Sequence, residues 1–207
     1  MPTDLTFFTH PMTRGRCVRW MLEEIGTPYD TVALEFQTTM KADEFLAINS
    51  MGKVPVIRHA GTIVTEAAAI CAYLADAFPD VGLAPATTAR GDYYRWLFFG
   101  AGPLDQAVTM NALGFEVPPD GVGTVGTRPL PQVIDALAKA LSQHAFLAGD
   151  AFTAADVYVG FNVGFGLRFG TIEPNGTLQS YWDRISDREA FQRASDMDDT
   201  LLRTMEA

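Results

Sequence analysis

The sequence predicts an α/β domain over residues 1–79, a linker over 80–86 and an all-α bundle over 87–207. Three observations lead to this fold class. Short β-prone runs alternate with helix-like spacing in the first part, a stretch bounded by Pro79 and Pro85 interrupts the pattern, and only helix-like spacing follows it. Such an order is typical of an α/β domain joined to a helical one.

Periodicity predicts the first strand, the first helix and the second strand. Leu5-Thr6-Phe7-Phe8 is β-prone and ends at Thr9-His10-Pro11. Apolar residues then recur at helical spacing, and a glycine falls where a helix cap belongs: Val18, Met21, Leu22, Ile25 and Gly26. Residues 29–34 resemble a second strand. A strand–helix–strand unit is a right-handed crossover, so we expect these strands to be parallel.

A short helix over 39–48, a β-hairpin and a further helix complete the first domain. Two apolar runs, 53–58 and 62–64, flank a short turn that contains Gly61, which predicts the hairpin. The helix after it is indicated by one apolar stripe: Ala67, Ile70, Cys71, Leu74 and Phe78. The predicted order is βαβαββα.

The second domain is predicted to be helical throughout. The helices are expected at 88–111 (bent near 100–103), 129–144, 153–165, 178–185 and 187–205. Phe152-Thr153-Ala154-Ala155-Asp156 places a threonine three residues before an acid, which predicts a capping box with a folding role. Residues 121–126 match the dinucleotide fingerprint, but no strand precedes them, so we interpret the match as a loop.

The composition of the chain argues against several classes of binding partner. The chain has 207 residues, a formal net charge of -10 and a pI near 4.6, so nucleic acid and anionic membranes are poor partners. We expect no signal peptide, no membrane span and no metal site. Cys17 and Cys71 lie in helical apolar patterns, and two buried thiols suit a reducing compartment. A cytoplasmic location is therefore expected.

Five motifs in order resemble the glutathione transferase superfamily, most closely bacterial members of the theta-like and delta-like serine or threonine type. They are Thr13-Arg14-Gly15-Arg16, Leu22-Glu23-Glu24-Ile25-Gly26, Asn49-Ser50-Met51-Gly52-Lys53-Val54-Pro55, Thr65-Glu66 and Phe152-Thr153-Ala154-Ala155-Asp156. The resemblance implies a thioredoxin-like first domain that binds glutathione, a helical domain that lines the electrophile site, a homodimer and a role in detoxification.

The resemblance also implies the residues that bind glutathione. Pro55 would follow a cis bond, which leaves the backbone of Val54 free to pair with the cysteinyl part; the alternative is a trans proline at a hairpin edge. Glu66 would bind the γ-glutamyl ammonium, or else serve only as a helix-start carboxylate. Ala67 replaces a serine of many relatives. Lys53 would meet the glycyl carboxylate, with Lys41 as a second cation, unless both are solvated surface lysines.

Thr13 is the predicted catalytic residue, because it falls where serine-type relatives place their serine. A hydroxyl donor at a helix start favours thiolate over thiol. Thr13 could instead be only a helix cap, and Thr9 and His10 are the alternatives. Phe7 and Phe8 occupy the strand in which tyrosine-type relatives carry their tyrosine.

The neighbours of Thr13 have competing interpretations. Arg14 and Arg16 either add positive potential near the thiolate or form ion pairs elsewhere. Cys17 follows the catalytic position by a helical turn, so burial is favoured over the chemistry of cysteine-type relatives. By resemblance, the electrophile pocket draws on aromatic and basic residues of the helical domain: Tyr94, Phe98, Phe165 and Arg168.

The sequence thus predicts a cytoplasmic, homodimeric glutathione transferase. It would conjugate the glutathione thiolate to small hydrophobic electrophiles, with peroxide reduction as a further activity. The alternative is a non-catalytic glutathione- or ligand-binding protein of the same fold. A glutathione-dependent isomerase is a third possibility.

Overall fold

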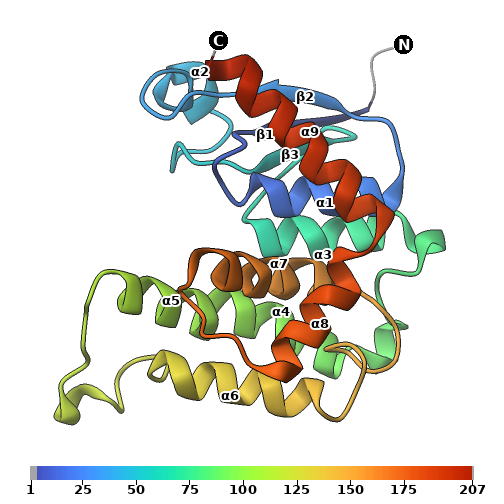
Figure 1. Cartoon of the computed structure of the whole chain (residues 1–207). Coiled ribbons are helices and arrows are strands. Elements are labelled where there is room, and N and C mark those ends of the chain that lie inside the picture. The colour runs from blue at the N-terminus through green and yellow to red at the C-terminus, as the bar shows by residue number, and fades with distance from the viewer. Residues whose placement is uncertain (1–3, 207) are drawn as a thin grey trace. The chain divides into compact units, whose positions relative to one another are not determined.

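The computed structural model describes residues 4–206, which divide into two compact units. The first contains the chain up to Val81 together with residues from Asp187 onward, and the second contains Gly82–Ser186. The first unit is α/β and the second is helical, so the predicted fold class is confirmed (Figure 1). The predicted second domain ends in a helix, α9, that groups with the first unit.

A four-stranded mixed sheet forms the centre of the first unit. Its strands are β1 (Leu5–Thr9), β2 (Asp30–Ala33), β3 (Val56–His59) and β4 (Thr62–Thr65), in the order β2-β1-β3-β4. β1 and β2 are parallel, as predicted, and the other two pairs are antiparallel. The parallel pair is joined by α1 (Gly15–Ile25), which makes the expected crossover.

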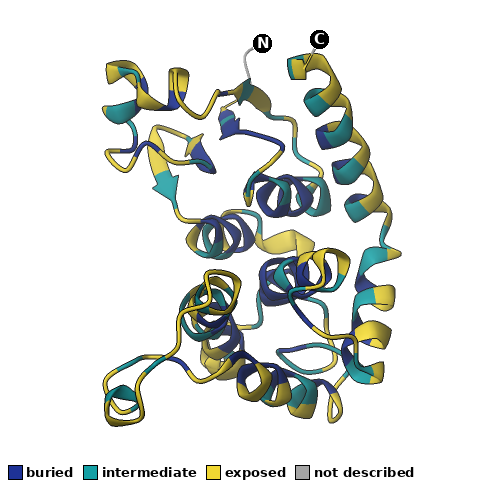
Figure 2. Cartoon of the chain, turned by 60° about the vertical axis from the view of Figure 1, so that its left-hand side comes forward, coloured by how far each residue is buried: buried dark blue, intermediate teal, exposed yellow. Residues whose placement is uncertain are grey.

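Helices α1 and α3 (Ala67–Ala77) pack against each other and present their apolar stripes to the interior. The thiols of Cys17 and Cys71 lie 4.0 Å apart, and both residues are buried. Every residue of α1 is buried or intermediate, whereas α3 also has exposed positions (Figure 2). The predicted helix over 39–48 is shorter than expected: a 3-10 turn (Thr39–Lys41) precedes α2 (Asp43–Leu46), because Ala42 between them is extended at ψ 147°.

The last helix, α9 (Glu189–Glu206), lies against α1 (Figure 1). Arg19 on α1 donates from Nε to Asp198 Oδ1 on α9 at 2.7 Å, and both side chains are buried. Burial raises the pKa of Asp198, while the charge of Arg19 lowers it. A buried ion pair fixes the register of two helices more reliably than it adds net stability.

The second unit is an all-α bundle. Its helices are α4 (Gly91–Phe99), α5 (Asp105–Ala112), α6 (Leu130–Leu141), α7 (Ala154–Phe169) and α8 (Gly176–Ser186). A π-helical turn, Gly100–Leu104, joins α4 to α5 and contains Pro103, which has no N–H for an intrahelical bond. The α-helical pattern is therefore interrupted at the place where the bend was predicted. Short 3-10 turns lie at Pro79–Val81, Thr87–Ala89 and Pro119–Gly121.

The capping box at the start of α7 is present. Asp156 Oδ2 accepts from the backbone N–H of Thr153 at 2.9 Å, and Oδ1 accepts from Leu147 N–H and from the hydroxyl of Tyr181. Burial raises the pKa of Asp156 despite these hydrogen bonds. Each bond satisfies a donor in the interior, so Asp156 is structural, as predicted.

Between residues 4 and 206, no helix is both long enough and apolar enough to cross a bilayer.

Candidate functional site

The strand register brings three of the predicted motifs to one end of the sheet. Phe8 in β1 pairs with Val56 in β3, which in turn pairs with Thr65 in β4. Because β3 runs antiparallel to both neighbours, the chain leaves β1, enters β3 and leaves β4 at the same edge. The turn after Thr9, the Val54-Pro55 segment and Glu66 therefore gather there, within two strand spacings, or about 10 Å.

The segment before β3 is a tightly folded loop. The Val54–Pro55 peptide bond is cis, as predicted. Asn49 Nδ2 donates to Lys53 O at 2.8 Å, and Asn49 Oδ1 accepts from Met51 N–H, so one buried amide closes the loop on both sides. Gly52 has φ +56°, and a Cβ there would lie 2.8 Å from Met40 O. Only glycine fits this position without displacing backbone.

Two lysines lie beside this loop. Lys53 is exposed and directly precedes Val54. Lys41 is also exposed, and its Nζ donates to Gly52 O at 2.9 Å. An anionic group near the cis-proline loop would thus meet two cations at the surface of a chain whose net charge is -10.

Glu66 has an unusual backbone for a residue with a side chain. Its φ is +67° and its ψ is 118°, and its side chain makes no capping hydrogen bond to α3. Glu66 therefore does not stabilise α3 through a side-chain capping hydrogen bond. Residues held at positive φ cost about 1–3 kcal/mol each and occur preferentially at functional sites. The exposed carboxylate of Glu66 is thus oriented toward solvent at an energetic cost.

The start of α3 offers backbone donors next to Glu66. Ile70 N–H makes the first intrahelical bond, to Glu66 O at 2.9 Å. The N–H groups of Ala67, Ala68 and Ala69 come before it, and the first N–H groups of a helix have no intrahelical partner. They can bind a carboxylate without the serine hydroxyl that Ala67 lacks.

Thr13 belongs to a tight turn between β1 and α1. Its Oγ1 donates to His10 O at 2.7 Å and accepts from Gly15 N–H at 3.0 Å. Thr13 is half-buried and lies two residues before the first residue of α1. The hydroxyl therefore both caps the first turn of the helix and keeps its proton on a backbone carbonyl. Donation to another acceptor requires rotation of this hydroxyl.

Gly15 is a site residue that the sequence analysis did not single out. A Cβ at Gly15 would lie 2.1 Å from Thr9 Oγ1 and 3.0 Å from Thr13 Oγ1. The helix start can approach the two threonines only because residue 15 has no side chain. Thr9 is completely buried, and its hydroxyl makes no hydrogen bond with the described residues. Thr9 is thus less accessible to a ligand than Thr13.

His10 supports the turn. Its Nδ1 accepts from Met12 N–H at 3.1 Å, so the neutral ring carries its proton on Nε2, which lies 4.0 Å from Glu35. Burial lowers the pKa of His10, and the Glu35 carboxylate partly offsets this effect. With only 6% of its surface exposed, His10 is a poorer thiol activator than Thr13.

The arginines and the cysteine that follow Thr13 in the sequence lie in different environments. Arg16 is ion-paired with Asp199 at 2.6 Å, which supports the ion-pair interpretation for this arginine. Arg14 is exposed at the N-cap of α1. Burial raises the pKa of Cys17 well above its ordinary value, so this thiol stays protonated, as the burial hypothesis expected.

The predicted electrophile-pocket residues lie on two helices of the second unit. Tyr94 and Phe98 are exposed on α4, and Phe98 is 72% accessible. Phe165 is 41% exposed on α7, next to Phe169 with ring centroids 4.5 Å apart, and Arg168 is exposed as well. α4 packs against α7. These helices therefore display accessible aromatic surface, whereas neighbouring Tyr93 and Trp96 are core residues.

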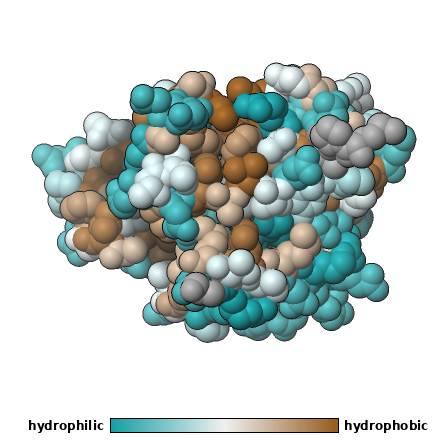
Figure 3. Space-filling view, turned by 90° about the horizontal axis from the view of Figure 1, so that it is seen from above, coloured by the Kyte–Doolittle hydropathy of each residue, from teal (hydrophilic) through white to brown (hydrophobic). Residues whose placement is uncertain are grey.

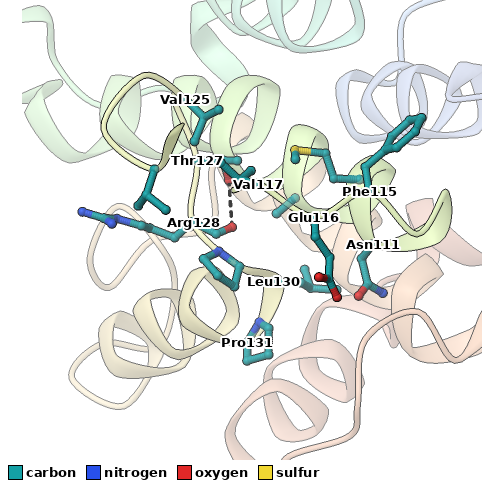
Figure 4. A pocket seen from close by; sticks show the side chains of 13 residues that line it. Asn111, Phe115, Glu116, Val117, Val125, Thr127, Arg128, Leu130 and Pro131 are labelled. Carbon is teal, nitrogen blue, oxygen red and sulfur yellow. Dashed lines mark hydrogen bonds between the residues drawn. The ribbon is translucent and has the colours of Figure 1, made fainter. Parts of the chain in front are cut away.

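A separate cavity of about 370 Å³ lies in the second unit, between the end of α5, the start of α6 and the connection between them (Figure 4). Apolar side chains such as Met110, Val117 and Leu130 line it. The hydroxyl of Thr127 donates a hydrogen bond to Pro103 O at 2.7 Å. None of the predicted pocket residues lines this cavity. The dinucleotide-like segment 121–126 forms turns here, in agreement with its interpretation as a loop.

Exposed apolar side chains accompany the polar groups of the first unit. Seen from above, hydrophobic side chains are visible near the middle of the face and toward its left side, among hydrophilic ones (Figure 3). Met12 in the turn after β1 and Met51 in the loop before Pro55 are each more than 60% exposed. The sheet end is therefore bordered by apolar as well as charged groups.

Comparison with known proteins gives a consistent family. Residues 3–76 match the model of the glutathione S-transferase N-terminal domain. The chain is 30% identical over 183 residues to glutathione S-transferase GstA of Escherichia coli O157:H7, covering 84% of this chain and 88% of that protein. It is 27% identical over 190 residues to glutathione S-transferase 3 of Zea mays, covering 85% and 86%.

Solved structures agree with the sequence comparison. A sphingomonad glutathione S-transferase complexed with glutathione superposes with a TM-score of 0.77 at 26% identity, covering 93% of this chain and 98% of that one. The likeness extends over both units of the fold.

Proposed function

This chain belongs to the glutathione S-transferase family, and on that premise we propose that it conjugates glutathione to small hydrophobic electrophiles. The observation that carries the proposal is the register that gathers the Thr13 turn, the cis Val54–Pro55 bond and Glu66 at one end of the sheet. Glutathione supplies the reactive thiol, and the residues of the chain bind, orient and activate it.

In the proposed complex, the peptide lies along this edge. The backbone N–H and C=O of Val54 pair with the cysteinyl residue. Glu66 binds the γ-glutamyl ammonium, and the N–H groups at the start of α3 bind the adjacent carboxylate. Lys53 and Lys41 provide positive charge for the glycyl carboxylate. The strained, uncapped conformation of Glu66 supports this role, because a purely structural helix start would not need it.

The hydroxyl of Thr13 would turn from His10 O to the sulfur and donate a hydrogen bond to the thiolate. This bond favours the charged form and lowers the thiol pKa below the ordinary value of about 8.5. The thiol proton leaves to solvent, the sulfur forms a bond to the electrophilic carbon, and the leaving group departs with the bonding electrons. The same thiolate would reduce peroxides.

Three further features of the proposal follow the family. The electrophile would contact the exposed aromatic residues on α4 and α7, with Tyr94, Phe98, Phe165 and Arg168 as its pocket. The chain would work as a homodimer in the cytoplasm. It would be organised as a glutathione-binding domain (1–79), a linker (80–86) and an electrophile-binding domain (87–207).

Replacement of Thr13 tests the catalytic role. Thr13→Val removes the donor at nearly constant volume. We expect the thiol pKa of bound glutathione to rise by about one unit and kcat/KM with an arylating substrate to fall at least about tenfold, while affinity for glutathione changes little. Ultraviolet absorbance of the thiolate against pH measures the first quantity, and steady-state kinetics measures the second.

Two companion variants sharpen this test. Thr13→Ser keeps the hydroxyl and is expected to keep activity. Thr9→Val removes a buried hydroxyl that has no partner among the described residues, so we expect no loss. Retained activity in Thr13→Val together with lost activity in Thr9→Val would transfer the catalytic role to Thr9.

A non-catalytic glutathione-binding protein is the second candidate. The observation that favours it is the commitment of the Thr13 proton to His10 O at 2.7 Å. Retention on immobilised glutathione without turnover of several electrophiles or peroxides would identify this function.

A further inference from the structure

Helices α1 and α9 are joined by arginine–carboxylate pairs whose polarity reverses along α1. The amino-terminal half of α1 is basic and meets acids just past the middle of α9, while its carboxyl-terminal half is acidic and meets one arginine just before α9 and one in the first half of α9. The pairs are Arg16–Asp199, Arg19–Asp198, Arg193–Glu23 and Arg188–Glu24. This pattern favours the antiparallel register (Figure 1).

Arg16 differs from the other arginines because it also binds the turn that carries Thr13. Its Nε donates to Pro11 O at 2.6 Å, and its Nη2 donates to Asp199 Oδ1 at 2.6 Å. The Arg16 side chain is 16% exposed, whereas that of Asp199 is 49% exposed. One planar guanidinium thus connects the turn, α1 and α9.

The hydrogen bonds of Thr13 and Met12 are local to the turn. Thr13 binds His10 O and Gly15 N–H, and Met12 N–H binds the His10 ring. These bonds set the shape of the turn but do not reach α9. Arg16 connects the turn to α9, because it donates both to Pro11 O and to Asp199, which lies 183 residues further along the chain.

We propose that Arg16 and Asp199 are positioning residues: together they hold Pro11, and through it the hydroxyl of Thr13, at the place where the glutathione thiolate forms. The inference rests on the proposed function. Asp199 fixes the guanidinium plane from one side, so that Nε points at Pro11 O. The C-terminal helix therefore takes part in thiol activation without touching glutathione.

A charge effect and a positioning effect predict opposite results. If Asp199 acted only through its charge, its removal would leave Arg16 more positive and lower the thiol pKa. If it positions the turn, its removal weakens the hydrogen bond from Thr13 and raises the thiol pKa. The other charged groups of the turn, Arg14 and the His10–Glu35 pair, are unchanged by the substitution.

The test compares Arg16→Lys, Asp199→Asn and a matched control. Lysine keeps the charge of Arg16 but cannot make the two divergent bonds of a guanidinium. Arg193→Gln is the control: it removes another half-exposed α1–α9 pair, with Arg193 51% exposed, at the opposite end of α1. Each full-length variant is assayed for kcat, KM for glutathione, thiol pKa and urea unfolding.

Arg16→Lys and Asp199→Asn are expected to lower kcat about tenfold and to raise the thiol pKa, with KM for glutathione nearly unchanged. The double variant should lose little more than either single one, because both break the same bridge. Arg193→Gln should keep kcat and thiol pKa even where its unfolding midpoint falls.

Several results would overturn the inference. They are an unchanged or lower thiol pKa in Asp199→Asn, full activity in Arg16→Lys, or an equal loss of kcat in Arg193→Gln, which would show a general effect of helix docking. A raised thiol pKa in Thr13→Val with normal Arg16→Lys refutes only the positioning role. An unaffected Thr13→Val refutes the catalytic assignment itself, and the inference with it.

Discussion

At the scale of single residues, several groups of the site have backbone conformations or surroundings that are energetically unfavourable for that residue type. Glu66 is at positive φ without a capping bond, and the buried hydroxyl of Thr9 has no hydrogen-bond partner among residues 4–206. Gly15 lets two hydroxyls approach the helix start. Glu66 and Thr13 could be proposed as site residues from the sequence because each lies in a local motif. Gly15 and Asp199 could not, because their roles depend on contacts with other segments.

The strain at Glu66 gives a prediction that separates stability from function. Glu66→Gly relaxes a positive φ, so we expect the free energy of unfolding to rise by about 1 kcal/mol while affinity for glutathione falls. Urea unfolding and calorimetric titration measure the two effects. Glu66→Ala is the matched control: it removes the carboxylate but keeps a Cβ at positive φ, so it should lose affinity without gaining stability. Equal stability in the two variants would argue against strain.

His10 predicts an acid limit for the turn. Its pKa is lowered from 6.5, chiefly by burial, so the folded chain binds fewer protons at this ring than the unfolded chain does. The stability contributed by neutral His10 is therefore present above about pH 6.5 and is lost as pH falls through the folded-state pKa. Proton–nitrogen NMR of the ring should show the Nε2–H form and a midpoint below 6.5. A higher midpoint, or a proton on Nδ1, would contradict the assignment.

At the scale of elements, the spacing of hydrophobic residues predicted the order of strands and helices. It could not predict which elements far apart in the sequence pack together. The helices α1 and α3 were predicted because each carries one clean apolar stripe. The predicted helix ending at 165 continues to Phe169, where Gly170 at φ +70° caps it. The docking of α9 on α1 could not be predicted, since its arginine–carboxylate pairs join residues more than 160 positions apart.

The buried carboxylate of Asp156, at the start of α7, leads to a prediction about the stability of the second unit. Asp156→Asn replaces an acceptor oxygen by a donor, so at least one N–H or O–H of Thr153, Leu147 or Tyr181 loses its partner. We expect a loss of about 2–4 kcal/mol in the free energy of unfolding. Thermal unfolding measures this loss. The control is Asp183→Asn at an exposed position of α8, which should change the free energy of unfolding little. A loss below about 0.5 kcal/mol would contradict the structural role.

At the scale of the whole molecule, the proposed function gives the two units separate roles. The first unit assembles charged and backbone groups at one end of its sheet. The second displays accessible aromatic side chains on α4 and α7. The net charge of -10 leaves the lysines beside the cis-proline loop as local positive charge in an acidic surface. Glutathione, which has carboxylates at both ends and one ammonium, matches this combination of lysines, helix-start N–H groups and Glu66.

The most direct test of the central claim is a crystal structure of the chain with glutathione. The account predicts that the γ-glutamyl ammonium contacts Glu66 and that Val54 pairs with the cysteinyl backbone. It also predicts that the sulfur lies within about 3.5 Å of Thr13 Oγ1, with the Thr13 hydroxyl no longer bonded to His10 O. Glutathione bound elsewhere, or a sulfur beyond the reach of Thr13 while the hydroxyl remains on His10 O, would contradict it.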